Sequence, residues 1–164
     1  MLNKPNYSKW FTTDVKRSLQ NILIIGSGVL LLTLLIGYAN EQVPVPILMG
    51  SFGASIFLVI AAPDTPFAKP KNVIVGHIIA SATGLVSLHL LGDSVMSMAI
   101  AVSLATMLML LLKVAHPPAA SNPITIFLSL ESWDFLWFTS VLGAIVIAIF
   151  ASIFHRIFKK SSRF

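Results

Sequence analysis

The side chains that could bind a small solute lie in two short stretches where proline and glycine interrupt an otherwise apolar chain. The first, VPVPILMGSFGASIF, covers residues 43–57, and the second, HPPAASNPITIF, covers residues 116–127. A helix that restarts after such a break presents unpaired N–H groups and the positive end of its dipole, which attract an anion. We therefore expect substrate-binding positions in both stretches: Gly50, Ser51, Gly53, Ser55, Ala119, Ala120, Ser121 and Asn122.

A second group of residues would line or gate the approach to that site: His77, Lys113, His116, Pro117 and Pro118. An ionisable side chain within a membrane span is a functional candidate by default, and histidine protonation could couple transport to pH. The alternative for His77, near the cytoplasmic start of its span, is a hydrogen-bonded structural histidine. His116 could fix the turn or touch the substrate, and Lys113 could reach the membrane surface or face a vestibule.

Other kinds of site are poorly supported by these residue types. The chain has no cysteine, no histidine pair at the spacing of a helical zinc site, and no acid within a span to orient a histidine. We therefore expect neither an enzyme, a metal site nor a cofactor. His89 and His155 are expected at the membrane interface.

The composition requires a lipid environment. Of 164 residues, 56% are hydrophobic and 10% charged, and the mean hydropathy is +0.88. A soluble domain is typically about 25% charged, so this composition cannot build a water-exposed surface. The net charge of +5 is dispersed and no base-reading motif is present, which argues against nucleic acid. The chain is predicted to be an all-α integral membrane protein in contact with lipid.

Six segments are predicted to cross the bilayer: 21–39, 43–62, 73–91, 95–115, 116–130 and 134–154. A span needs roughly 20 apolar residues, and the fifteen residues of 116–130 would cover only about 22 Å as a plain helix. The second and fifth spans are the interrupted ones. Splitting the chain after the third span gives two halves of three spans in opposite orientation, which predicts a 3+3 inverted repeat.

Charge supports six crossings with both termini inside, because cytoplasmic loops collect Lys and Arg. That topology places every basic residue on the cytoplasmic side: Lys4, Lys9, Lys16, Arg17, Lys69, Lys71, Lys113, Arg156, Lys159, Lys160 and Arg163. The domain organisation is then a cytoplasmic segment 1–20, a transmembrane domain 21–155 and a basic tail 156–164. The first apolar run is too long for a signal peptide, and Trp10 and Phe11 are expected to anchor it.

The remaining spans carry small residues at four-residue intervals, which let helices approach closely. In the third span these are Gly76, Ala80 and Gly84, and in the sixth Ser140, Ala144, Ala148 and Ser152. We interpret both stripes as packing surfaces.

Three signatures together resemble the HPP family of integral membrane proteins: GSFGAS (50–55), APDTPFAKPKNVIVGH (62–77) and AHPPAA (115–120). The resemblance covers roughly residues 20–155. It implies a compact multi-span domain that transports a small inorganic anion, since nitrite transport is attributed to some members. The chain departs from the family's His-Pro-Pro-Ala-Gly-Ala pattern at Ala120, Ser121 and Asn122, which bears on the substrate more than on the fold.

The function predicted from the sequence is thus a transporter or channel for a small monovalent anion, with nitrite as the first candidate. Its expected location is the bacterial inner membrane, where it could form a homo-oligomer. The alternative is a membrane scaffold or partner subunit without transport activity, in which the broken helices serve only packing.

Overall fold

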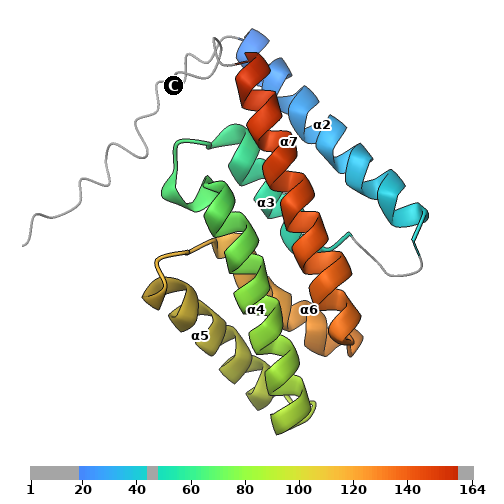
Figure 1. Ribbon diagram of the computed structural model, residues 1–164, viewed down its shortest axis with the longest axis vertical. Coiled ribbons are helices and arrows are strands. Elements are labelled where there is room, and N and C mark those ends of the chain that lie inside the picture. The colour runs from blue at the N-terminus through green and yellow to red at the C-terminus, as the bar shows by residue number, and fades with distance from the viewer. Residues whose placement is uncertain (1–18, 44–47, 159–164) are drawn as a thin grey trace, which may run out of the picture.

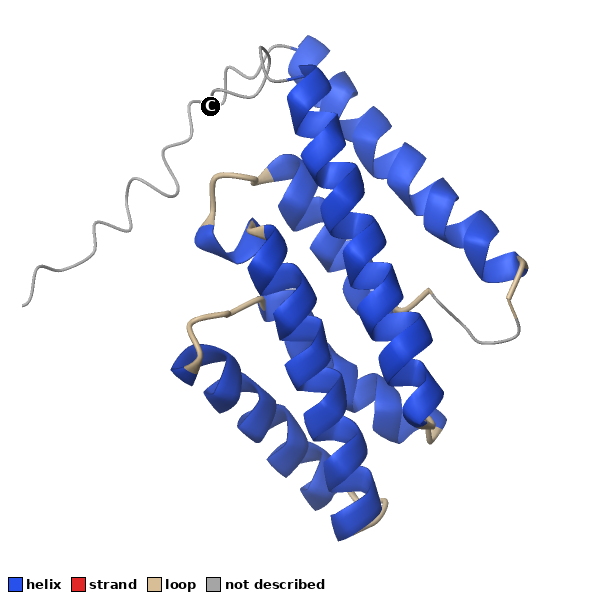
Figure 2. Cartoon of the chain, viewed as in Figure 1, coloured by secondary structure: helices blue, strands red, loops and turns tan. Residues whose placement is uncertain are grey.

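The computed structural model describes residues 19–43 and 48–158, and throughout these ranges the regular structure is helical, with six α-helices (Figure 2). The predicted anchors Trp10 and Phe11, the proline pair Pro44 and Pro46, and most of the two basic terminal segments lie outside the described residues.

Three helical segments are long and apolar enough to cross a membrane: α2 (Leu19–Glu41), α4 (Pro70–Leu91) and the segment Phe135–Phe158. They contain the predicted first, third and sixth spans. A further helix, α5 (Val95–Leu111), matches the fourth span but is 17 residues long. Its first turn is capped by Ser94, whose Oγ accepts the backbone N–H of Ser97 at 3.1 Å.

The second and fifth segments are short, as their prolines and glycines predicted. Helix α3 (Gly50–Ala61) has 12 residues, about 18 Å of helix, and it occupies the second half of the expected span 43–62. The fifth segment divides into a 3₁₀ turn, η2 (Pro117–Ser121), and a helix of eight residues, α6 (Asn122–Ser129). Both prolines of η2 lie in its first turn, where proline's missing N–H costs no hydrogen bond.

The last segment begins with a π-helical stretch, η3 (Phe135–Leu142), which continues into α7 (Gly143–Phe158). No residue pattern predicted this wider turn. It places Thr139 and Ser140 together on the buried side of the helix. A polar hydroxyl from the sixth span therefore reaches the interior of the bundle.

The long helices α4 and α7 run side by side through the centre, with α2 outside α7 and α5 outside α4 (Figure 1). Short helices fill the interior: α3 packs on α2 and α7, while α6 packs on α5 and α4. A 3₁₀ turn, η1 (Pro66–Ala68), connects α3 to α4. The two short helices are thus held between the long ones, and η2 contacts both α3 and α4.

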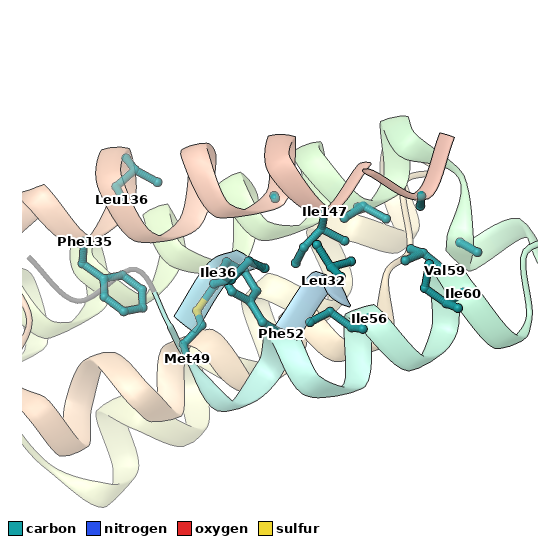
Figure 3. Packing of buried hydrophobic residues seen from close by; sticks show 14 of the residues in the cluster. Leu32, Ile36, Met49, Phe52, Ile56, Val59, Ile60, Phe135, Leu136 and Ile147 are labelled. Atoms are coloured by element: carbon teal, nitrogen blue, oxygen red, sulfur yellow. The ribbon is translucent and has the colours of Figure 1, made fainter. Parts of the chain in front are cut away.

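The apolar core lies between α2, α3 and α7 (Figure 3). Phe52 and Ile56 of α3 are fully buried there beside Leu32 and Ile36 of α2 and Ile147 of α7. Gly143 faces the Phe52 ring so closely that a Cβ at that position would overlap it. Close packing of α7 on α3 therefore depends on a glycine at the start of α7.

The small residues of α4 seat the fifth segment. Gly76, Ala80 and Gly84 are all buried, as close helix packing requires. A Cβ on Gly76 would lie 2.8 Å from Cβ of His116, and one on Gly84 would lie 3.0 Å from Cα of Pro123. In the sixth span Ser140, Ala144 and Ala148 are buried, whereas Ser152 is exposed.

Candidate functional site

A cluster of polar side chains lies in the interior where the two interrupted segments meet α4 and η3. We call it the polar cluster, and each of its members has a fully buried side chain: Ser55, His77, Ser81, His116, Asn122 and Ser140. Burying polar groups in an apolar bundle is costly unless they are hydrogen-bonded. We therefore take the polar cluster as the candidate functional site.

Ser55 of α3 is at the centre of the cluster, between two imidazole rings. Its Oγ lies 3.0 Å from Nε2 of His77 and 2.9 Å from Nε2 of His116. The two ring centroids are 5.1 Å apart. One hydroxyl thus joins a histidine of α4 to the histidine that precedes η2, and its bond to His116 spans 61 residues of sequence.

The hydrogen bonds determine which nitrogen of each neutral ring carries the proton. Nδ1–H of His116 donates to the carbonyl oxygen of Phe67 at 2.8 Å, so its Nε2 must accept, and Ser55 donates to it. Because the hydroxyl has a single hydrogen, Nε2–H of His77 must donate to Ser55 Oγ. Nδ1 of His77 then accepts, and it lies 3.0 Å from Nδ2 of Asn122.

Asn122 continues the chain of hydrogen bonds toward the sixth span. Its Nδ2 also donates to Ser81 Oγ at 2.8 Å, and the Ser81 hydroxyl is in a short hydrogen bond with Ser140 of η3. The cluster therefore connects α3, α4, α6, η3 and the residue that precedes η2 in one directional network. All six side chains are uncharged in this arrangement.

Two buried polar atoms at the cluster have no hydrogen-bond partner: Oδ1 of Asn122, and Oγ of Ser51 one turn before Ser55. Leaving such an atom unpaired costs about 1–3 kcal/mol. One is an acceptor and the other can donate. A small polar solute could satisfy either atom.

The connection between α3 and α4 holds Nδ1 of the His116 ring, the nitrogen that does not bond to Ser55. Phe67, whose carbonyl holds the ring, belongs to η1. Nδ2 of Asn72 donates to the carbonyl oxygens of Pro66 and Ala115 at 3.0 and 3.1 Å, and so ties this turn to the chain preceding His116. Gly76 then allows His116 to lie directly against α4. The same contacts therefore fix this turn and orient the imidazole of His116.

The structure separates the predicted binding residues into two groups. Ser51, Ser55 and Asn122 lie in or beside the polar cluster. Gly50 and Gly53 are on the exposed face of α3, where an added Cβ would meet nothing within 4 Å. Ala119 is buried against α4 and α5, with Ala120 packed beside it, and the Ser121 hydroxyl donates to the carbonyl of Pro118 at 2.9 Å.

The predicted pathway residues are also divided. His77 and His116 are in the polar cluster, and Pro117 and Pro118 form the first turn of η2 immediately after His116. Lys113 is exposed on the turn before them, with a left-handed φ of 56°.

Two polar contributors were not among the residues chosen from the sequence. Asn72 is one of them, although a polar amide in the first turn of an apolar helix is a usable signal. Ser140 was interpreted only as part of a packing stripe, and its bond to Ser81 could be inferred only from the spatial neighbourhood of the two helices.

The remaining histidines lie apart from the cluster. His89 is exposed on α4 and its ring approaches Trp133 at 5.8 Å, while His155 of α7 donates from Nε2 to the carbonyl of Val59 at 2.7 Å. Within residues 19–43 and 48–158, no three His, Cys, Asp or Glu side chains come together as a metal site would need.

Comparison with known proteins gives a family match over nearly the whole chain. The model described as "HPP, transmembrane region" matches residues 14–163. Two similar proteins are transmembrane proteins of Dictyostelium discoideum: one is 27% identical over 95% of this chain and 61% of its own length, the other 32% identical over 63% of this chain and 35% of its own. The chain thus spans about three fifths and one third of these relatives. No solved structure gives a significant match.

Proposed function

The chain belongs to the HPP transmembrane family, and we propose that it is a transporter or channel for a small monovalent anion, with nitrite as the leading candidate. The two Dictyostelium relatives are named only as transmembrane proteins. The proposal therefore depends on the polar cluster and on the resemblance of the HPP signatures to those of anion-transporting members.

The observation that carries the proposal is the contact between the two interrupted segments through Ser55 and His116. Interrupted helices in corresponding positions of two halves point to a transport site where they meet. His77 lies seven residues into α4, about 10 Å from its start, so the cluster is inside the bundle and not at its rim. Ionisable groups at such a place mark an ion pathway.

The anion would be held by hydrogen-bond donors near the start of α3. The Ser51 hydroxyl has no partner, and the first backbone N–H groups of α3 lie beside it at the positive end of the helix dipole. Gly50 and Gly53 leave that end of α3 uncovered. From the fifth segment, Asn122 and Ser121 would have to release their present acceptors, His77, Ser81 and Pro118, before they could donate to the anion.

The helix contacts are those expected of a 3+3 inverted repeat. Exchanging α2, α3 and α4 for α5, α6 and α7 maps the pair α2–α3 onto α5–α6, the pair α3–α7 onto α6–α4, and the pair α2–α7 onto α5–α4, and all six pairs are in contact. This pattern supports two related halves of three helices each, while the distribution of Lys and Arg supports cytoplasmic termini. We place the protein in the inner membrane of a bacterium.

A scaffold or partner subunit is the second candidate, and one observation favours it. Most polar atoms of the cluster bond to one another, as they would in a network that serves only to hold helices together. The scaffold candidate predicts that no anion crosses the membrane through this protein. The transport candidate predicts a flux that depends on the cluster.

Nitrite influx into proteoliposomes separates the two. The purified wild-type protein is expected to raise influx above that of protein-free vesicles, while Ser55→Ala and His116→Ala should each lose most of the increase. Absence of any protein-dependent anion flux would leave the scaffold candidate. Normal flux in both variants would overturn the site assignment.

The matched control is Ser152→Ala. Ser152 is an exposed serine of α7 whose hydroxyl donates to the carbonyl of Ala148 within its own helix and not to a cluster residue. This variant removes a helical serine hydroxyl, as Ser55→Ala does, but should keep the wild-type flux. Size-exclusion profiles of all variants show whether they are folded.

A further inference from the structure

The Ser55 hydroxyl has two acceptors for its single hydrogen. Nε2 of His116 lies 2.9 Å from Oγ, and the carbonyl oxygen of Ser51, in the preceding turn of α3, lies 3.0 Å away. While His116 is neutral, its Nε2 has a lone pair that needs the hydrogen, so the hydroxyl points toward the ring. The Ser51 carbonyl is the alternative partner.

A proton arriving at the cluster would reverse this arrangement without moving a heavy atom. It would bind the lone pair of His116 Nε2, and the new N–H would donate to Ser55 Oγ. The Ser55 hydrogen would turn away to the Ser51 carbonyl. Nδ1–H of His116 keeps its bond to Phe67, and Nε2–H of His77 keeps its bond to Ser55, so every donor in the charged state has an acceptor.

His77 is less suited to the proton. Its Nε2 already donates to Ser55, so an added proton would have to bind Nδ1, which faces the amide Nδ2 of Asn122 at 3.0 Å. Two donors would then point at each other until the amide turned over. That rotation would also turn Oδ1 toward Ser81, so the Ser81 hydroxyl would have to reorient and donate to it. The site for the proton is therefore His116.

Among the described residues, no charged side chain near His116 could balance a positive charge on its ring. Of the elements packed against η2, α3, α5 and α6 contain no Asp, Glu, Lys, Arg or His, and on α4 the ionisable group that meets His116 is His77. Lys71 and His89 of α4 are exposed, as are Asp64, Lys69 and Lys113 on the adjoining turns. The charge on His116 would have to be balanced by a mobile anion.

We propose that the polar cluster is a proton-binding site, in which His116 Nε2 takes up one proton as the Ser55 hydroxyl turns to Ser51, and that one proton accompanies each anion. The coupling of one proton to each anion rests on the proposed function, whereas proton uptake by His116 does not. The proton on His116 and the monovalent anion together carry no net charge. The membrane potential therefore does not act on the protein when both are bound.

The proton site is tested by NMR of the wild-type protein with ¹⁵N- and ¹³C-labelled histidine in nanodiscs. The chain has four histidines, and His89→Gln, at an exposed position outside the cluster, removes one signal to aid assignment. At neutral pH we expect the Nδ1–H form of His116 and the Nε2–H form of His77. As pH falls, His116 should become doubly protonated while His77 stays neutral. An Nε2–H form of His116 at neutral pH, or protonation of His77 first, would overturn the proton site.

Coupling is tested in proteoliposomes carrying a pH dye, with protein-free vesicles subtracted for the passive leak of nitrous acid. We expect inward nitrite flux to acidify the lumen by one proton per anion and to be unchanged by a potassium diffusion potential. Ser55→Ala should lower this flux about tenfold, since a charge-assisted hydrogen bond is lost, while Ser152→Ala should not. Flux that follows the potential without acidification would refute coupling and leave anion transport standing. A complete absence of flux would refute the proposed function, and the NMR result would still decide the proton site.

Discussion

Replacing Gly76 by alanine is expected to displace His116 from the polar cluster. The added Cβ would lie 2.8 Å from Cβ of His116, 3.4 Å from Sδ of Met109 and 3.5 Å from the carbonyl oxygen of Val114. Carbon atoms not bonded to each other rest at about 3.5–4.0 Å, so the two Cβ atoms must separate by about 1 Å. A displacement of that size would break the 2.9 Å bond from Ser55 to His116.

The free-energy change combines opposing effects. Alanine is favoured over glycine within a helix by about 1 kcal/mol. Forcing an extra carbon into a packed contact costs about 1–3 kcal/mol, and each of the two hydrogen bonds of the His116 ring contributes about 1 kcal/mol. The net expectation is a loss of about 2–4 kcal/mol of stability, with loss of anion flux, since steric overlap and lost bonds outweigh the gain in helix propensity.

The assay is thermal unfolding in detergent micelles, with Gly26→Ala as the matched control. Gly26 is an exposed helical glycine of α2 with nothing within 4 Å of an added Cβ, so its substitution should leave the melting temperature unchanged or slightly raised. Gly76→Ala should melt several degrees lower. If Gly76→Ala were as stable as Gly26→Ala and kept its flux, the inferred packing of His116 on α4 would be wrong.

Three further predictions concern the turns, the topology and the pH response. Asn72→Ala should lower the melting temperature, because the carbonyls of Pro66 and Ala115 lose their donor at a cost of about 1–3 kcal/mol; an unchanged melting temperature would contradict the role of Asn72 as a tie. Cysteines introduced at Lys69 and Glu131 should label from opposite sides of the membrane, and labelling of both from the periplasm would refute six crossings. Partial burial raises the pKa of Glu131 above its ordinary value, so its carboxyl binds more protons in the folded state and stability is lost as pH rises through that window. Glu131→Gln should therefore gain in melting temperature relative to wild type as pH rises from below the ordinary glutamate pKa to neutral, and a parallel pH dependence of the two proteins would contradict this.

The helix breaks could be predicted from the sequence because proline and glycine act locally. The segment at 117–129 is divided where its prolines occur, and α3 begins at Gly50 after the proline pair. Gly76 and Gly84 were recognised as packing positions from their spacing alone. These features depend on residues close in sequence, for which steric rules are sufficient.

The orientation of α3 was harder to predict because the helix is apolar around most of its circumference. In a membrane the alternation of apolar and polar faces that fixes a soluble helix is absent, so Gly50 and Gly53 were placed in the site together with Ser51 and Ser55. The spacing offers one clue: Ser51 and Ser55 are four residues apart and share a face, from which Gly50 and Gly53 turn away.

The sharing of one serine hydroxyl by His77 and His116 could not be predicted, since it depends on three segments distant in sequence. Neither histidine has a sequence neighbour that identifies the other as its partner. The same holds for Ser140, which reaches Ser81 by way of the π-helical stretch at the start of the sixth span. Long-range pairing of this kind follows only from the packed bundle.

The central claim is that the second and fifth segments form one anion site through Ser55 and His116, and nitrite flux in a double-mutant cycle tests it most directly. If the two residues act as a unit, the variant with both Ser55→Ala and His116→Ala should transport no more slowly than the slower single variant. If the losses in flux of the two single variants multiply in the double variant, the residues act independently and the claim of a single shared site is contradicted.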